Sequence, residues 1–323
     1  MRSVWCVVLY AVVLASVCCG EVRFRKDCAA VFASVEEGKK LLMTPDEYIE
    51  RLSVFDRLSR MDTDTDVPQK AYLEFIGRGV LAWNEQEIQR LSKAIRSIGS
   101  RLGGFTFAFP EVIYLVKTSG IEECGAAYTR GNGIFLPLNM LRWSEQQLAE
   151  LVCHELFHVL SRHNPALRDR LYQVVGFEKC NEIRLPADLA ARQITNPDAP
   201  RLDCRIRVQY EDKAIWTVPF LCSRTQTYDP NEGGGMFYYL EFKLLAVEPG
   251  ADANDFTVML HDGQPLLLDA GRVSGYFEQI GYNTHYIIHP EEILADNFVI
   301  LVYGKTDAPS TELLGRIAEV IAE

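Results

Sequence analysis

Two histidines with a glutamate between them form the most informative pattern of the chain. His154, Glu155 and His158 read H-E-x-x-H. Residues four apart lie on the same face of an α-helix, so both imidazoles can reach one zinc ion. The glutamate lies where it can take a proton from a water molecule that the ion activates. The pattern therefore predicts a hydrolytic Zn2+ centre.

The residues around this pattern predict the helix that the chemistry needs. Ser144, with Gln147 three residues later, forms a capping box, so a helix should begin near residue 145. Asn164 and Pro165 end the helical pattern. The apolar residues between them recur at helical spacing, at Leu148, Leu151, Val152, Val159 and Leu160. The alternative, two histidines simply packed in a helix, leaves their polar atoms in need of partners.

A catalytic zinc needs a third protein ligand, and a second helix near the C-terminus can supply it. Pro290 suits a first helical position, and acidic residues follow it in the first turn. Glu292 and Asp296 share a face of this predicted helix. Glu292 can bind the metal, whereas Asp296 can accept the second N–H of a ligand histidine and fix its tautomer. Without the histidine motif, these acids would be interpreted as an ordinary acidic face.

Other residues compete for the third position. Glu178 lies closer to the motif in sequence, but the residue four positions later is Glu182 rather than an aspartate. His285 and His289 lie close to Glu292 and could also bind the metal. Glu292 is preferred because it alone is accompanied by its own orienting acid.

The two motifs together resemble those of the gluzincin metallopeptidases, which carry H-E-x-x-H on one helix and E-x-x-x-D on a second. The resemblance implies that His154, His158 and Glu292 bind Zn2+. It implies that Glu155 is the general base and that Asp296 orients His154. It also implies an α+β fold with a zincin-like core, in which a mixed sheet with an edge hairpin packs on the H-E-x-x-H helix. The interval between the two motifs is longer than in a compact thermolysin-like site.

The predicted activity is peptide-bond hydrolysis of a peptide or protein substrate. Glu155 would pass the proton of the water to the leaving amine, and the oxyanion would need a further donor besides zinc. Tyr286 and His289, just before the second helix, are predicted for this role, in competition with Tyr282 and His285. The alternative is a catalytically inactive zinc-binding envelope protein that acts as a binding module, or a structural protein with an accidental motif. The intact glutamate argues against inactivity.

Composition and the N-terminus restrict partners and location. The formal net charge of −11 and the absence of a basic patch argue against a nucleic-acid partner. Residues 1–20 contain Arg2, a short apolar run and then Cys18, Cys19 and Gly20, which predicts a signal peptide or a lipoprotein signal. The protein is therefore expected to be exported: periplasmic, secreted or lipid-anchored to the cell envelope. A membrane would be reached only through an N-terminal lipid.

The order of predicted elements divides the rest of the chain into regions. We predict an N-terminal helical region (21–102), a core with the motif helix (103–200), an inserted antiparallel β subdomain (201–275) and a C-terminal part of the core with the third-ligand helix (276–323).

Specific elements are expected within these regions. They are a helix from Asn84 to about residue 101, a strand over 105–117, a hairpin over 126–136, strands over 205–210, 215–221 and 237–247, and a strand over 299–303.

Overall fold

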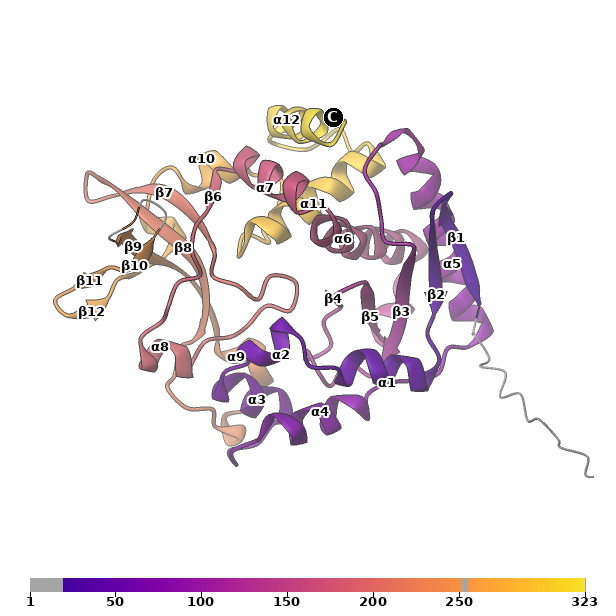
Figure 1. Cartoon of the computed structure of the whole chain (residues 1–323), viewed down its shortest axis with the longest axis horizontal. Helices are drawn as coiled ribbons and strands as arrows, with labels where there is room; N and C mark the ends of the chain where they lie inside the picture. The colour runs from indigo at the N-terminus through magenta and orange to yellow at the C-terminus, as the bar shows by residue number, and fades with distance from the viewer. Residues whose placement is uncertain (1–19, 251, 253–254, 323) are drawn as a thin grey trace, which may run out of the picture.

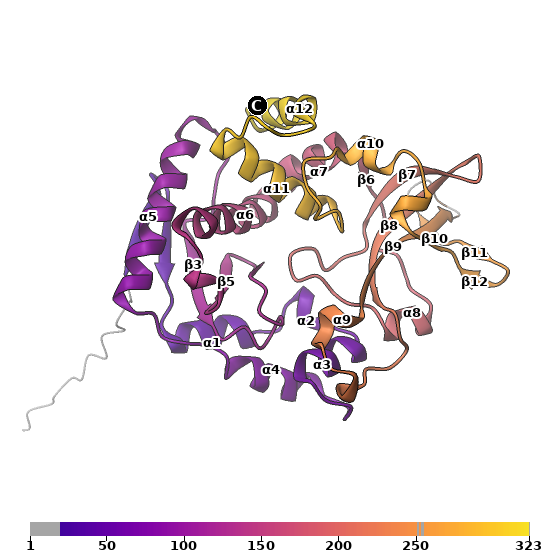
Figure 2. The same cartoon turned by 180° about the vertical axis from the view of Figure 1, so that it is seen from behind.

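The computed structural model describes residues 20–250, 252 and 255–322. The architecture is α+β, as predicted, with two main sheets on opposite sides of the molecule and helices between and around them (Figure 1, Figure 2). The predicted signal segment falls, as far as residue 19, outside the described residues. No helix in the described part is long and apolar enough to cross a membrane.

The first sheet is mixed and ends in the predicted hairpin. Its outer pairs are antiparallel and its two central pairs are parallel. The strand at one edge, β4, therefore pairs only with β5 and leaves its other side open to further contacts. The spatial order of the strands is β1 (Glu21–Arg25), β2 (Cys28–Phe32), β3 (Val112–Thr118), β5 (Gly133–Pro137) and β4 (Tyr128–Arg130).

Two predictions for this part of the chain are wrong in detail. The region 21–102 was predicted to be helical but opens with β1 and β2, whose short hairpin offers too few residues for a clear alternation pattern. The strand predicted over 105–117 begins only at Val112. The preceding residues bury Phe107 and Phe109 without pairing in a sheet, so their apolar character reflects packing alone.

Five helices follow β2 and precede β3. The longest, α5, begins after the predicted Asn84 cap and packs on β1 and on α6. The five are α1 (Val35–Met43), α2 (Glu47–Arg51), α3 (Val54–Met61), α4 (Gln69–Gly77) and α5 (Glu85–Arg101).

The helix that carries the histidine motif, α6 (Glu145–His163), lies at the centre of the molecule. The predicted capping box of Ser144 and Gln147 forms at its start. Two further helices follow nearby, α7 (Pro165–Val174) and, much later, α11 (Pro290–Tyr303), which packs along α6. The last helix is α12 (Thr311–Ala322).

The strand predicted over 299–303 is wrong, because α11 continues through it. Helix α11 is buried on most of its surface, so its second half is apolar all round and resembles a buried strand. Gly304, with φ of +61°, ends the helix in the left-handed conformation.

The second sheet is antiparallel throughout. The strands predicted over 205–210 and 215–221 are present as β7 and β8, whereas residues 237–239 belong to a short helix, α9 (Gly235–Tyr239). Its spatial order is β10 (Phe256–Val258), β9 (Leu240–Pro249), β8 (Lys213–Ser223), β7 (Cys204–Tyr210) and β6 (Phe177–Lys179), and β13 (Leu267–Leu268) also pairs with β9. The other short α-helices and strands of the described residues are α8 (Ala187–Ala191), β11 (Leu260–His261), β12 (Gln264–Pro265) and α10 (Tyr276–Ile280).

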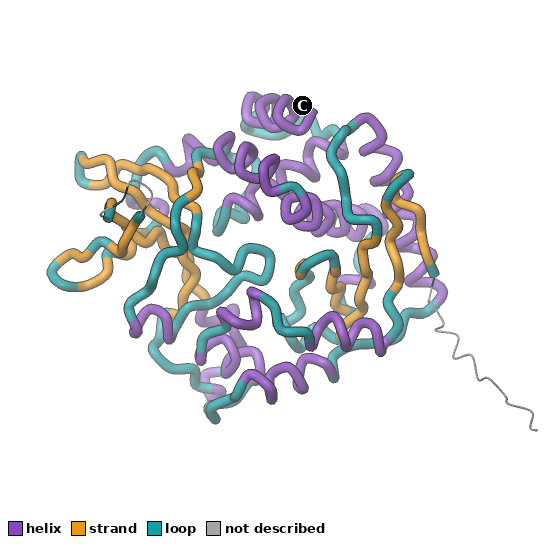
Figure 3. The backbone as a smooth tube through the Cα atoms, in the orientation of Figure 1, coloured by secondary structure: helices purple, strands orange, loops and turns teal. Residues whose placement is uncertain are grey.

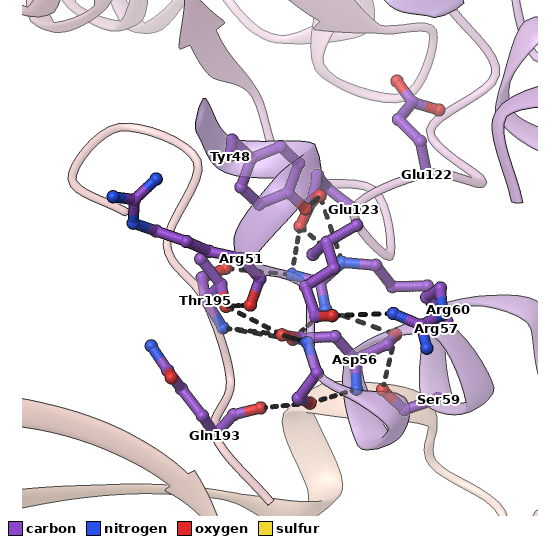
Figure 4. A network of polar contacts seen from close by, with 12 residues as sticks. Tyr48, Arg51, Asp56, Arg57, Ser59, Arg60, Glu122, Glu123, Gln193 and Thr195 are labelled. Atoms are coloured by element: carbon purple, nitrogen blue, oxygen red, sulfur yellow. Dashed lines mark hydrogen bonds and ion pairs between the residues drawn. The ribbon is translucent and has the colours of Figure 1, made fainter. Parts of the chain in front are cut away.

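A buried charge network joins three segments that are distant in sequence (Figure 4). The Arg60 guanidinium on α3 forms ion pairs with Asp56 and Glu123, and all three side chains are buried. Arg60 also donates to the carbonyl oxygen of Thr195, with an Nη2–O distance of 3.1 Å. Because Glu123 belongs to the segment that leads into β4, one side chain fixes both this segment and the segment around Thr195.

Glu122, the neighbour of Glu123 in sequence, is also a buried carboxyl group, but its side chain lies outside this network. It points away from Arg60 in Figure 4, and neither of its oxygens has a hydrogen-bond partner among the described residues. Burial raises the pKa of Glu122 to about 7, and contacts from Thr118 and Tyr128, which lack hydrogen-bond geometry, offset this only in part. The neutral acid is therefore the form that suits the fold.

Replacing Glu122 with Gln should stabilise the protein in alkaline rather than acidic solution. The pKa of Glu122 in the fold exceeds its ordinary value of 4.5. The contribution of this carboxyl group to wild-type stability is therefore fully present below pH 4.5 and is lost as the pH rises through about 7. The gain in the free energy of unfolding should be about 2 kcal/mol larger at pH 8 than at pH 5, measured by urea unfolding. Glu123→Gln, which breaks the Arg60 ion pair, should destabilise at both pH values. Equal effects of Glu122→Gln at pH 5 and pH 8 would contradict the assignment.

Candidate metal centre

Helices α6 and α11 bring the three predicted metal ligands together. Nε2 of His154 lies 3.2 Å from Oε2 of Glu292, and Nε2 of His158 lies 3.5 Å from the same oxygen. One ligand atom from each of the three residues lies within 4.8 Å of the others. The two imidazoles and the carboxylate therefore face a common point.

The opposite ring nitrogens of both histidines are held by carboxylates. Nδ1 of His154 lies 2.9 Å from Oδ1 of Asp296, and Nδ1 of His158 lies 3.1 Å from Oε1 of Glu291. A carboxylate can only accept, so each Nδ1 carries a proton, and a metal that displaces the proton on Nε2 finds its lone pair directed at the common point. Asp296 contacts the histidine that the resemblance implied. Glu291 has the same role for His158 and was not predicted.

Hydrogen bonds from other side chains fix these two carboxylates. Glu291 accepts from the hydroxyls of Ser161 and Tyr172 at 2.8 Å and 2.6 Å. Asp296 accepts from the hydroxyl of Thr284. Both acids are thus held in place before any metal arrives, which favours fixed imidazole orientations.

The carboxylates that hold Nδ1 should tune zinc affinity without being essential for it. Asp296→Asn and Glu291→Gln keep the side-chain shape but weaken the hold on one imidazole each. Each is expected to lower zinc affinity about 10- to 100-fold, measured by competition with a chromophoric chelator. Asp269→Asn, an exposed acid beside Lys243 on the second sheet, is the charge-matched control and should leave the affinity unchanged. Unchanged affinity in both test variants would contradict their orienting role.

The donor set fits a divalent cation. Nε2 of His158 is buried and has no hydrogen-bond partner among the described residues. Burial disfavours the charged form of His154, but hydrogen bonds to Asp296 and Glu292 outweigh burial and raise its pKa to about 10. Burial acts likewise on His158, yet the charges of Asp198 and Glu292 keep its pKa well above the usual range. The carboxylates thus require positive charge here, which protons or a metal ion can supply.

Glu155, the predicted base, lies beside these ligands on the buried face of α6. Its Oε2 accepts a hydrogen bond of 2.8 Å from the hydroxyl of Thr129 on β4. Burial raises the pKa of Glu155, and the positive charges of His158 and His154 oppose this shift. The edge strand therefore positions the base directly, through a residue that the sequence did not single out.

A cavity of about 630 Å³ opens onto the centre. It is lined by His154, Glu155 and Glu292, by Ala126 and Ala127 just before β4, and by Tyr286. The ring of Tyr286 lies 6.2 Å from that of His154, between ring centroids. The negative charge of Glu292 raises the pKa of Tyr286 well above its usual value, so its hydroxyl remains a donor. The structure thus brings one of the two predicted oxyanion donors to the cavity.

His289 lies elsewhere. It caps α11, where its Nδ1 accepts from the backbone N–H of Glu291 at 3.1 Å, and its Nε2 lies 3.3 Å from Sγ of Cys204. Burial lowers its pKa to about 4, so the ring is neutral. It is absent from the described lining of the metal-facing cavity and lines a second one instead. Its position therefore does not suit the predicted role in oxyanion binding.

The competing residues do not join the group of ligand atoms, and none of them is among the described residues that line the metal-facing cavity. Glu178 lies on β6 and forms an ion pair with Arg205 at 2.8 Å. Tyr282 and His285 are exposed on the segment before α11. Among the candidates for the third ligand, Glu292 is the one whose carboxylate oxygen lies within 3.5 Å of both Nε2 atoms.

No family model matches the chain, and no curated protein or solved structure shows significant similarity to it.

Proposed function

We propose that the protein is an exported zinc metallopeptidase with a zincin-like core. The observation that carries the proposal is the convergence of two Nε2 atoms on one carboxylate oxygen, with a carboxylate behind each Nδ1. Glu155 beside this group supplies the base that a non-catalytic zinc site does not need. The mixed sheet supports the same function. Its edge strand β4 lies against α6, so a substrate peptide that paired with β4 would pass beside the metal centre.

Each residue of the site has a distinct task in amide hydrolysis. His154, His158 and Glu292 would hold Zn2+. When bound, the ion would polarise the scissile carbonyl and lower the pKa of a water molecule, so that this water could act as the nucleophile. Glu155 takes the water proton on a carboxylate oxygen and delivers it to the nitrogen of the leaving amine. The hydroxyl of Thr129 keeps that carboxylate in position.

Two further parts of the site act on the substrate. The hydroxyl of Tyr286 can donate to the carbonyl oxygen as negative charge builds on it. The side of β4 that faces away from β5 can bind an extended peptide through main-chain hydrogen bonds. Peptide or protein is therefore the proposed substrate class, and the negative net charge gives no reason to expect nucleic acid.

The proposed location rests on the N-terminal sequence alone. A charged residue, an apolar run and small residues around Cys18–Gly20 fit an export signal, with lipidation as one outcome. The site would then act outside the cytoplasm.

Metal analysis combined with peptide digestion tests the function. Purified protein should carry about one zinc per chain and should cleave members of a diverse peptide library. A chelator should abolish cleavage, and added Zn2+ should restore it. Absence of zinc after reconstitution, or zinc without any cleavage that a chelator prevents, would overturn the proposal.

A further inference from the structure

The loop between α8 and β7 crosses the open edge of β4. Figure 3 shows it extending from the second sheet toward the first. The backbone N–H of Thr129 donates to Oδ1 of Asp198 at 2.8 Å. Nη2 of Arg162 donates to the carbonyl oxygens of both Thr129 and Asp198, each at 3.2 Å. The main-chain groups of Thr129 that a peptide substrate would use are thus already bonded within the chain.

The same loop reaches the metal centre. Nδ2 of Asn196 donates to Oε1 of Glu292 at 2.7 Å. The carboxylate of Asp198 has an oxygen within 4.8 Å of ligand atoms of Glu155 and His158. The loop therefore places a carboxylate beside both the base and a metal ligand, in the region that a substrate carbonyl would have to enter.

Two cavities meet at this crossing. The cavity of about 630 Å³ lies on the side of Ala126 and Ala127, and a second cavity of about 580 Å³ lies on the side of Arg130 and Gly131. Asp198 lines both of them. Since these four residues flank β4 or belong to it, the two cavities lie toward opposite ends of the edge strand, and Asp198 of the loop is in the wall of both.

The loop is fixed at its ends and held only by side chains in its middle. The N–H of Ile194 donates to the carbonyl of Leu221 at 2.9 Å, and that of Ile183 to the carbonyl of Leu202 at 2.9 Å. Thr195 is tied to Asp56 and Arg60 in the buried network of Figure 4.

Between these anchors the attachments are polar side-chain contacts. Arg201 pairs with Glu47 at 2.6 Å, and both side chains are nearly half exposed. Pro197 and Pro200 lack an N–H and cannot pair as strand residues with β4. The exposed Arg201–Glu47 pair adds little to stability, and the other attachments are a few single hydrogen bonds, so the middle of the loop can be displaced without unfolding its anchored ends.

We infer that the segment Asn196–Arg201 is a displaceable strap that occupies the path of an extended peptide along β4, with Asp198 taking the place of the substrate at the metal centre. The inference rests on the proposed function and adds a regulatory step to it. Substrate, or a partner that binds the strap, has to lift the segment before the two cavities become one groove.

Cobalt-substituted protein and acetohydroxamate, a small metal-binding probe, test the strap apart from catalysis. The visible bands of bound Co2+ change when its ligands change, so a titration gives the affinity for the probe. Asp198→Ala should bind acetohydroxamate at least about tenfold more tightly than wild type, because the competing carboxylate is gone. The double variant Asp198→Ala/Arg201→Ala, which also releases the Glu47 contact, should raise kcat/KM for peptides by about tenfold or more.

Matched variants keep the outcomes distinct. Asp188→Ala on α8 and Arg184→Ala, both exposed and nearby in sequence, remove the same charges and should change nothing. Asp198→Asn preserves an acceptor for the Thr129 N–H and removes the competing charge, so it should also bind the probe more tightly. It replaces the alanine variant in the test if that variant folds poorly.

Three results would count against the strap. Cobalt binding with equal probe affinity in wild type, Asp198→Ala and Asp198→Asn overturns the strap and leaves the proposed function standing. A loss of metal from the Asp198 variants without tighter probe binding also overturns it, since Asp198 would then be a permanent ligand. Failure of wild type to bind any metal overturns both proposals.

Discussion

Glu155→Gln is expected to leave zinc in place and to lower kcat for peptide hydrolysis about 10²- to 10⁴-fold. The amide cannot take a proton from water, yet its oxygen can still accept from the hydroxyl of Thr129, so the fold around α6 should not change. The effect should appear mainly in kcat, because Glu155 acts on the reacting proton rather than on the bound peptide. Zinc content and steady-state kinetics on a cleaved library peptide measure the two halves of the expectation.

A control on the same helix separates chemistry from helix stability. Glu145→Gln alters an exposed first-turn residue that pairs with Lys93 and should leave kcat unchanged. Equal cleavage by wild type and Glu155→Gln would remove Glu155 from the mechanism and, with it, the peptidase assignment.

Glu292→Ala should cause the largest loss of zinc affinity of any single substitution described here. One oxygen of this carboxylate faces both imidazole Nε2 atoms, so its removal takes away a ligand rather than an orienting group. The loss should exceed the 100-fold upper range for orienting residues, measured by chelator competition. Glu292→Gln should also lose affinity, although it keeps an acceptor for Asn196.

The rival ligand supplies the matched control. Glu178→Ala removes a glutamate that forms an ion pair with Arg205 on the second sheet, and zinc affinity should stay as in wild type. The reverse pattern, with affinity lost on Glu178→Ala and kept on Glu292→Ala, would transfer the ligand role and refute the centre described here.

Local signals explain the parts of the site that the sequence predicted. The capping box at Ser144 and the proline at position 290 mark helix starts through contacts within a few residues, and both helices begin where expected. The four-residue spacings then fix which side chains share a face, so His154 with His158 and Glu292 with Asp296 could be paired in advance.

The residues that the sequence missed depend on distant contacts. Glu291 precedes Glu292 and lies about 100° away around the helix, so its approach to His158 depends on how α6 and α11 pack. Thr129 and Asp198 come from an edge strand and a loop, and no motif marks either of them. His289 was placed near the metal by its position in sequence, but the capping geometry of α11 turns its ring toward Cys204.

The guanidinium of Arg60 has a consequence for any attempt to trim the molecule. It joins Glu123, just before β4, to Thr195 at the base of the strap, and thereby ties both walls of the groove to α3. Helix α3 is thus part of the architecture of the centre, although it offers neither a ligand nor a base. A minimal fragment that starts after α5 would keep the zinc motifs but lose the brace that sets the distance between the walls.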